Sequence, residues 1–207
     1  MPNSNNKNII FKDFSYNIYS QNGEDGVIEA IIKKLNLENE LENWCVEFGA
    51  WDGRHLSNTF NLITKGWNAV YIEGDKNRFK DLLNTVKKYP KIIPLNNFVS
   101  RQTNNENSLD RLLENTYLPK DFEILSIDID SYDLEVWESL VNYKPKIVII
   151  EINSGYPPGI IKWHSGANKY SNGNSFSATI NVAKNKGYGL VCDTGNMICV
   201  KNELMKN

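Results

Sequence analysis

The chain has 207 residues, of which 41% are hydrophobic and 23% charged, and its formal net charge at pH 7 is −2. This length predicts one well-filled domain over residues 1–207, and the charge gives no electrostatic basis for binding nucleic acid or an anionic membrane. Because the sequence has neither a long apolar run nor the apolar core of a signal peptide, we expect a soluble, cytoplasmic protein.

The predicted elements follow a polar N-terminal extension, residues 1–18. The first helix is expected over 23–36, because Val27, Ile28, Ile31, Ile32 and Leu35 recur at helical spacing. Strands and helices then alternate. The predicted strands are 44–48, 68–73, 91–95, 123–128, 147–152, 188–194 and 197–201. The predicted helices between them are 57–65, 77–89, 108–115, 134–142 and 175–186.

This alternation predicts an α/β fold of Rossmann-like type. Strands 123–128 and 147–152 are continuous apolar runs, typical of parallel strands that are buried on both faces between helices. Gly195-Asn196 indicates a tight hairpin, so the last strand should be antiparallel. The three cysteines, Cys45, Cys192 and Cys199, lie in apolar runs, which predicts reduced core thiols.

Each strand of the predicted parallel part ends in polar residues, and ligands of open α/β sheets bind at those ends. The residues are Glu47, Gly49 and Asp52, then Glu73, then Asn96 and Asn97, then Asp128 and Asp130, then Glu151 and Asn153. Helix caps and turns are the alternative explanation. It is weak for Glu47, an acid inside an apolar strand, and for Asp128-Ile129-Asp130, where two like charges share one side of the chain.

The first two strand ends predict a nucleoside-containing cofactor. Gly49 allows the backbone to approach a ligand closely, and Glu73 is placed to accept hydrogen bonds from both ribose hydroxyls. Trp51 stands where a dinucleotide site needs its second glycine, so a pyrophosphate would not fit against this turn. S-adenosylmethionine, which has adenosine without phosphate, fits better. Its adenine is expected near Asn97 and Phe98.

Several motifs together resemble the FkbM-like class I methyltransferases, over about residues 19–201. They are Ser20-Gln21-Asn22-Gly23-Glu24-Asp25, Val46-Glu47-Phe48-Gly49-Ala50-Trp51-Asp52-Gly53, Leu56-Ser57-Asn58-Thr59, Gly66-Trp67, Ile72-Glu73-Gly74, Ser126-Ile127-Asp128-Ile129-Asp130 and Gly187-Tyr188-Gly189-Leu190-Val191. The resemblance implies a seven-stranded sheet with a reversed last strand, S-adenosylmethionine as methyl donor, and often a sugar or polyketide hydroxyl as acceptor.

The chain departs from this family after the fourth strand. There an Asp is commonly followed by Gly and Glu, whereas this chain has Asp130-Ser131-Tyr132-Asp133. The departure concerns the acceptor side more than the cofactor side. From the strand ends and the resemblance together, the expected cofactor-binding residues are Gln21, Glu47, Gly49, Ala50, Asn58, Glu73, Gly74, Asn97, Phe98 and Asp128.

Methylation of a hydroxyl requires loss of its proton, and the sequence offers two routes. His164, in the long loop 153–174, is the candidate general base, with Asp130 as a second catalytic candidate on the acceptor side. The other route is Mg²⁺ or Mn²⁺, held by the all-oxygen set Asp128, Asp130, Glu151 and Asn153. The alternatives are that Asp128 binds the methionine amino group while the others hold loops, and that His164 is a solvent-exposed loop residue.

We therefore expect a methyltransferase whose partner is a small hydroxylated acceptor. The acceptor would be a carbohydrate or sugar nucleotide of bacterial polysaccharide or secondary-metabolite synthesis, covered by loop 153–174, where Trp163 and Tyr170 are candidates to stack on a sugar. One rival is an NAD(P)-dependent sugar reductase or epimerase, which Trp51 and the lack of a Tyr-x-x-x-Lys pair disfavour. Another is a non-catalytic nucleotide-binding scaffold, which has no use for the strand-end acids. The oligomeric state stays open, a homo-oligomer included.

Overall fold

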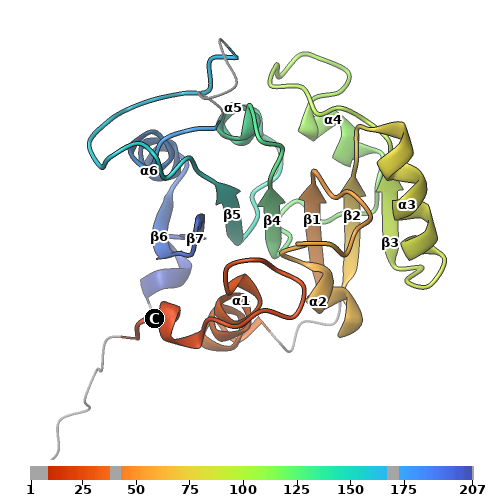
Figure 1. Ribbon diagram of the computed structural model, residues 1–207, viewed down its shortest axis with the longest axis horizontal. Helices are drawn as coiled ribbons and strands as arrows, with labels where there is room; N and C mark the ends of the chain where they lie inside the picture. Colours follow the sequence, from red (N-terminus) through yellow and green to blue (C-terminus); the bar gives the residue numbers. More distant parts are fainter. Residues whose placement is uncertain (1–8, 38–42, 167–172, 207) are drawn as a thin grey trace, which may run out of the picture.

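The computed structural model describes residues 9–37, 43–166 and 173–206, which form a seven-stranded sheet with helices on both faces (Figure 1). The strand order is β3-β2-β1-β4-β5-β7-β6. The strands are β1 (Trp44–Phe48), β2 (Asn68–Ile72), β3 (Ile92–Leu95), β4 (Ile124–Ile127), β5 (Ile147–Glu151), β6 (Tyr188–Asp193) and β7 (Asn196–Lys201).

The direction of the strands agrees with the sequence pattern. β1 to β5 pair in parallel, whereas β7 is antiparallel to both β5 and β6. The predicted Rossmann-like sheet with a reversed last strand is therefore confirmed. The chain runs outward from β1 through β2 to β3 and then returns to place β4 on the other side of β1, so strand order reverses between β1 and β4.

Two hydrophobic clusters, one on each face, explain how the helices cover the sheet. Successive residues of a strand point to opposite faces, and accordingly Val46 belongs to one cluster and Cys45 to the other. The first cluster is completed by α4 (Leu109–Glu114), α5 (Asp133–Ser139) and α6 (Phe176–Asn185). The second is completed by α1 (Glu24–Lys34), α2 (Phe60–Thr64) and α3 (Lys76–Val86). Figure 1 shows α1 and α2 on one side of the sheet, and α5 and α6 on the other.

The helix α2 is shorter than the predicted 57–65, for a reason that matters for the site. Ser57 and Thr59 donate hydrogen bonds to the buried carboxylate of Glu47 on β1. Ser57 Oγ also accepts the backbone N–H of Phe60, the first residue of the helix. The predicted 134–142 helix likewise ends early, at Ser139.

The segment before α1 packs on the body of the protein. A short 3-10 helix, η1 (Phe11–Phe14), contacts α1, and one oxygen of Asp25 accepts the backbone N–H groups of Ile18, Tyr19 and Ser20. Glu24 is fully buried and accepts hydrogen bonds from Thr194 and Asn196 at the β6–β7 turn. The chain ends its described part in a second 3-10 helix, η3 (Leu204–Lys206).

The three cysteines are free and buried, as predicted. No helix in the described ranges has the length and apolar character needed to cross a bilayer.

Candidate functional site

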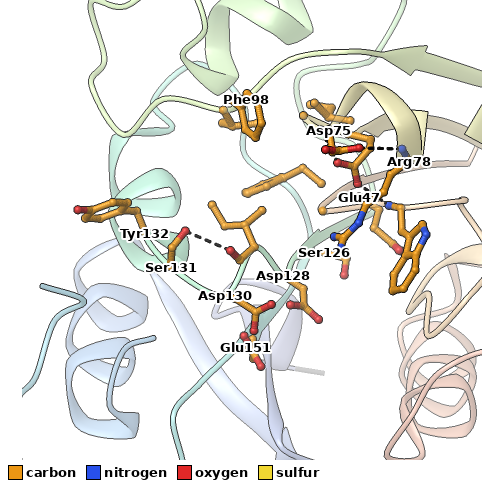
Figure 2. A pocket seen from close by; sticks show the side chains of 18 of the residues that line it. Glu47, Asp75, Arg78, Phe98, Ser126, Asp128, Asp130, Ser131, Tyr132 and Glu151 are labelled. Atoms are coloured by element: carbon orange, nitrogen blue, oxygen red, sulfur yellow. Dashed lines mark hydrogen bonds between the residues drawn. The ribbon is translucent and has the colours of Figure 1, made fainter. Parts of the chain in front are cut away.

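A cavity of about 800 Å³ opens at the carboxyl ends of the parallel strands, where strand order reverses (Figure 2). We call it the switch-point cavity. Most sequence-predicted site residues line it: Gln21, Glu47, Gly49, Asn58, Glu73, Gly74, Asn97, Phe98, Asp128, Asp130 and Glu151. Ala50, Asn153 and His164 are not among the described residues that line it.

The floor of the cavity is the turn after β1, and Gly49 holds it against the end of β4. Gly49 has φ +81°, and a Cβ there would lie 2.8 Å from the carbonyl carbon of Asp128 and closer still to its oxygen. Only glycine fits such a conformation and such a contact. The N–H groups of Gly49 and Ala50 both donate to the carbonyl of Ile72, at 3.1 and 3.2 Å. Ala50 is buried, so its contribution is to fix this turn.

Glu47 places a buried carboxylate in the wall of the cavity. It is 6% exposed, and its Oε2 accepts hydrogen bonds from Ser57 Oγ (3.0 Å), Thr59 N (3.0 Å) and Thr59 Oγ1 (2.7 Å). Burial raises the pKa of Glu47 to about 7, although the Thr59 and Ser57 hydroxyls lower it. Near neutral pH a cation placed beside this group would therefore favour its charged form.

Glu73, immediately after β2, links the turn after β1 to the turn after β2 through two hydrogen bonds. Its Oε2 accepts the N–H of Trp51 at 2.8 Å, and its Oε1 accepts the N–H of Asp75 at 2.7 Å. Each carboxylate oxygen retains a second lone pair, so the group can also accept hydrogen bonds from a ligand in the cavity that it lines. Asp75 in turn caps α3 by accepting the N–H groups of Asn77 and Arg78.

An aromatic ring lies beside the end of β2, against the residue that follows Glu73. Phe98 is 76% exposed, which is unusual for so large an apolar side chain. Its ring lies against Gly74, where a Cβ would come within 2.8 Å of the ring Cγ. Asn97 donates from Nδ2 to Asn107 Oδ1 at 3.1 Å, which fixes the loop that carries Phe98. The ring is thus a flat apolar surface beside a carboxylate, suited to a nucleoside base.

Three carboxylates, Asp128, Asp130 and Glu151, form what we call the acid cluster. One oxygen from each lies within 4.8 Å of the others, and Figure 2 shows the cluster on the side of the cavity opposite Phe98. Asp130 has φ +56°, and the turn is held by Asp133, whose carboxylate accepts the N–H groups of Ile129 and Ser131.

Two members of the cluster, Asp128 and Glu151, have a raised pKa. Desolvation by the cavity walls, with the neighbouring charges of Asp133 and Asp130, raises the pKa of Asp128 to about 6. Desolvation, followed by the charges of Asp128 and Asp130, raises the pKa of Glu151 to about 8. Such a group holds protons near neutral pH, or else takes a cation.

Asn153 and His164 lie just outside the cavity. Asn153 follows β5, and its Oδ1 accepts the N–H of Gly155 at 2.9 Å. His164 packs edge-on against Tyr132, with ring centroids 4.5 Å apart, and its Nδ1 accepts the N–H of Gly173 at 3.2 Å. His164 thus contacts Tyr132, which lines the cavity, but is not itself among the described lining residues. Its role as a base stays a prediction. Of the two candidate stacking residues, Trp163 packs against the core and Tyr170 lies outside the described residues.

Sequence reasoning did not select several residues that line the cavity, among them Arg78, Arg101, Ser126 and Tyr132. Arg101 lies 4.0 Å over the ring of Tyr132, and Arg78 lies 4.5 Å over the ring of Trp51. Ser126 Oγ accepts a hydrogen bond from Asn58 across the β1–β4 boundary. No sequence pattern indicates the two arginine–aromatic pairs, because each joins residues that are far apart in the chain.

Neither a family model nor a curated protein matches the chain, so the FkbM-like resemblance stays an expectation from the motifs. Solved structures do match. One is the CMeT domain of citrinin polyketide synthase, with a TM-score of 0.55 and 13% identity over 88% of this chain and 54% of that one. Another is CurJ carbon methyltransferase, with a TM-score of 0.54 and 9% identity over 85% of this chain and 52% of that one. A third is the N-terminal domain of EvdMO1, solved in the presence of SAH and D-fucose, with a TM-score of 0.51 and 9% identity over 90% of this chain and 89% of that one.

The chain spans about half the length of the first two of these proteins. At identities this low the likeness concerns the fold alone: the chain has the seven-stranded Rossmann-like fold that methyltransferases also have.

Proposed function

We propose that the protein is an S-adenosylmethionine-dependent methyltransferase that methylates a hydroxyl of a carbohydrate or sugar nucleotide. The charge of the switch-point cavity carries the proposal. Six of its described lining residues are acids, against two arginines. The acids are Glu47, Glu73, Asp75, Asp128, Asp130 and Glu151. S-adenosylmethionine brings a sulfonium and an ammonium to such a cavity, and both favour the ionised form of the carboxylates.

The cavity also has a place for each part of this cofactor. Phe98 and Gly74 form the apolar surface for adenine, and Glu73 accepts the ribose hydroxyls. Glu47 and Asp128 face the methionine amino group. A dinucleotide suits the cavity poorly, because its pyrophosphate would meet the acids and the turn carrying Trp51, which has φ +47° where a close phosphate contact needs glycine.

A hydroxyl acceptor fits the acid cluster on the other side of the donor. Methyl transfer forms a carbon–oxygen bond while the carbon–sulfur bond breaks, and sulfur keeps the electron pair. The hydroxyl proton must go to a base. The ionised form of Glu151 would accept it, because a carboxylate whose pKa is raised to about 8 binds a proton more tightly than an ordinary one. His164 packs against Tyr132 and is not among the described residues that line the cavity, so Glu151 is the better placed base. The sugar in the EvdMO1 structure supports a carbohydrate acceptor.

A divalent metal belongs to the same proposal. Asp128, Asp130 and Glu151 offer only oxygen donors, in a group close enough to share one ion, which is the chemistry that Mg²⁺ and Mn²⁺ prefer. When bound, the ion would lower the pKa of the acceptor hydroxyl. Asn153 would join this set only by exchanging its Gly155 hydrogen bond for the metal.

Two measurements test the proposal. Calorimetric titration with S-adenosylhomocysteine and with NADH tests the donor: binding of the first alone supports a methyltransferase, and binding of NADH alone overturns it. A mass-spectrometric screen of hexoses and sugar nucleotides with methyl donor, with and without EDTA, then tests the acceptor. A mass gain of one methyl group on a sugar supports the proposal. Full activity in EDTA would show that methyl transfer does not require a divalent metal.

A further inference from the structure

Arg101 is a cation in the cavity wall without an ion-pair partner among the described residues. It follows β3 and lines the switch-point cavity. Within the described ranges, no Asp or Glu oxygen lies within the 4.0 Å that defines an ion pair with it. Its charge acts on Glu135 of α5, whose pKa is raised by burial while the Arg101 charge opposes that rise.

The backbone around Arg101 is fixed, so the side chain starts from a defined position. Ser100 N donates to Asn107 O at 2.8 Å, and Ser100 forms a β-bridge with Ser108. Ser100 Oγ accepts the N–H of Gln102 at 3.2 Å. The loop 100–108 is therefore closed at its neck, directly beside Arg101.

The guanidinium is also held in orientation. Its carbon lies 4.0 Å over the ring of Tyr132, and His164 supports the same ring, with centroids 4.5 Å apart. His164 N in turn donates to Asn174 Oδ1 at 2.8 Å. A guanidinium that packs over an aromatic ring can still present N–H groups in the fork geometry that binds phosphate or carboxylate with two hydrogen bonds.

The position of Arg101 separates it from the donor. The acids assigned to the donor alone are Glu47 on β1 and Glu73 after β2, whereas Arg101 contacts Tyr132, which follows Asp130 of the acid cluster in the chain. Its charge would thus serve the other substrate. The competing anion is the methionine carboxylate of the donor, and the S-adenosylhomocysteine affinity of the Arg101 variants separates the two.

We infer that Arg101, stacked on Tyr132, is the anion-recognising residue of the acceptor site, so that the acceptor carries a phosphoryl or carboxylate group. This inference rests on the proposed function and narrows its substrate class. It favours sugar phosphates, sugar nucleotides and uronic acids over neutral sugars.

The test measures binding to the intact protein loaded with S-adenosylhomocysteine. The probes are glucose, glucose 6-phosphate, UDP-glucose and glucuronate, which separate a phosphoryl source from a carboxylate source. Arg101→Ala should weaken the best anionic probe by about ten-fold or more, as expected for a lost charge-assisted hydrogen bond. Arg101→Lys should fall between, because it keeps the charge without the fork.

Variants at Tyr132 and Arg111 test, respectively, the contribution of the aromatic ring and a nonspecific effect of losing one positive charge. Tyr132→Phe keeps the ring, so binding should stay within about two-fold, whereas Tyr132→Leu should weaken it. Arg111→Ala removes an exposed arginine of α4 that pairs with Glu114 outside the cavity, and should bind like the unaltered protein. S-adenosylhomocysteine affinity should not change in any of them.

Three results would overturn the inference: unchanged anion binding by Arg101→Ala, glucose binding as tightly as its anionic relatives, or no binding of any anionic probe. If S-adenosylhomocysteine itself fails to bind, the proposed function fails instead. The comparison of Arg101→Ala with the unaltered protein on the same probes, without cofactor, then still tests whether Arg101 recognises anions.

Discussion

Replacing Gly49 by alanine should damage the protein far more than the same change at another glycine of similar backbone conformation. Gly49 has φ +81° and Gly66 has φ +93°, so each substitution forces alanine into the left-handed region, at a cost of about 1–2 kcal/mol. The surroundings differ. At Gly66 nothing lies within 4 Å of the new Cβ, whereas at Gly49 the Cβ meets the backbone carbonyl of Asp128.

The second cost applies to Gly49 alone. Backbone cannot swing aside as a flexible side chain can, so the β1 and β4 ends must separate, and such overpacking costs about 1–3 kcal/mol more. Gly49→Ala should therefore lose about 2–5 kcal/mol in the free energy of unfolding, and Gly66→Ala about 1–2 kcal/mol. Because the displaced carbonyl belongs to the cavity floor, only Gly49→Ala should also weaken S-adenosylhomocysteine binding.

Urea unfolding at equilibrium gives the stabilities, and calorimetry gives the affinities of both variants. If the two variants lose the same stability, the close approach between Gly49 and Asp128 is not real. If Gly49→Ala binds the cofactor normally, the floor of the cavity is not where the donor lies.

Three other outcomes follow from the site. Glu73→Ala should weaken S-adenosylhomocysteine binding by about 1–3 kcal/mol, because ribose hydroxyls and two backbone N–H groups lose their acceptor; unchanged affinity in a calorimetric titration would mean that Glu73 is misassigned. Folding raises the pKa of Asp128 from 3.8 to about 6 and the pKa of Glu151 from 4.5 to about 8, so the folded state holds these protons more tightly than the unfolded state. The stability that this gives the folded protein is fully present below the lower value of each pair and is lost as the pH rises through the higher one. Thermal unfolding of the unliganded protein should show that decline, and Glu151→Gln should reduce it; an identical pH profile would contradict the coupling. Mg²⁺ should restore stability at pH 8 in the unaltered protein and less so in Glu151→Gln, and an equal effect in both would place the ion elsewhere.

The sheet could be predicted from sequence because its signals are local. Continuous apolar runs at β4 and β5 reveal strands buried on both faces, and Gly195-Asn196 reveals the hairpin that reverses β7. Helix boundaries were less accurate where side chains bind elsewhere in the fold. The start of α2 is set by hydrogen bonds to Glu47, which is distant in sequence and cannot be read from helix propensity.

The donor side of the site could be predicted for a similar reason. Residues that end parallel strands meet at one edge of the sheet, so Glu47, Glu73 and Asp128 could be placed together without coordinates. The acceptor side depends on pairs between loops, such as Arg101 on Tyr132, and no periodicity encodes them. His164 illustrates the difference: its loop was recognised, but its packing behind Tyr132 follows only from the fold.

The most direct test of the central claim is a calorimetric titration of the unaltered protein with S-adenosylmethionine, alongside NADH as the competing nucleoside cofactor. We expect one molecule of S-adenosylmethionine to bind per chain in the switch-point cavity, with no heat from NADH. Binding of NADH in its place, or S-adenosylmethionine binding that Glu73→Ala and Gly49→Ala leave unchanged, would contradict the account.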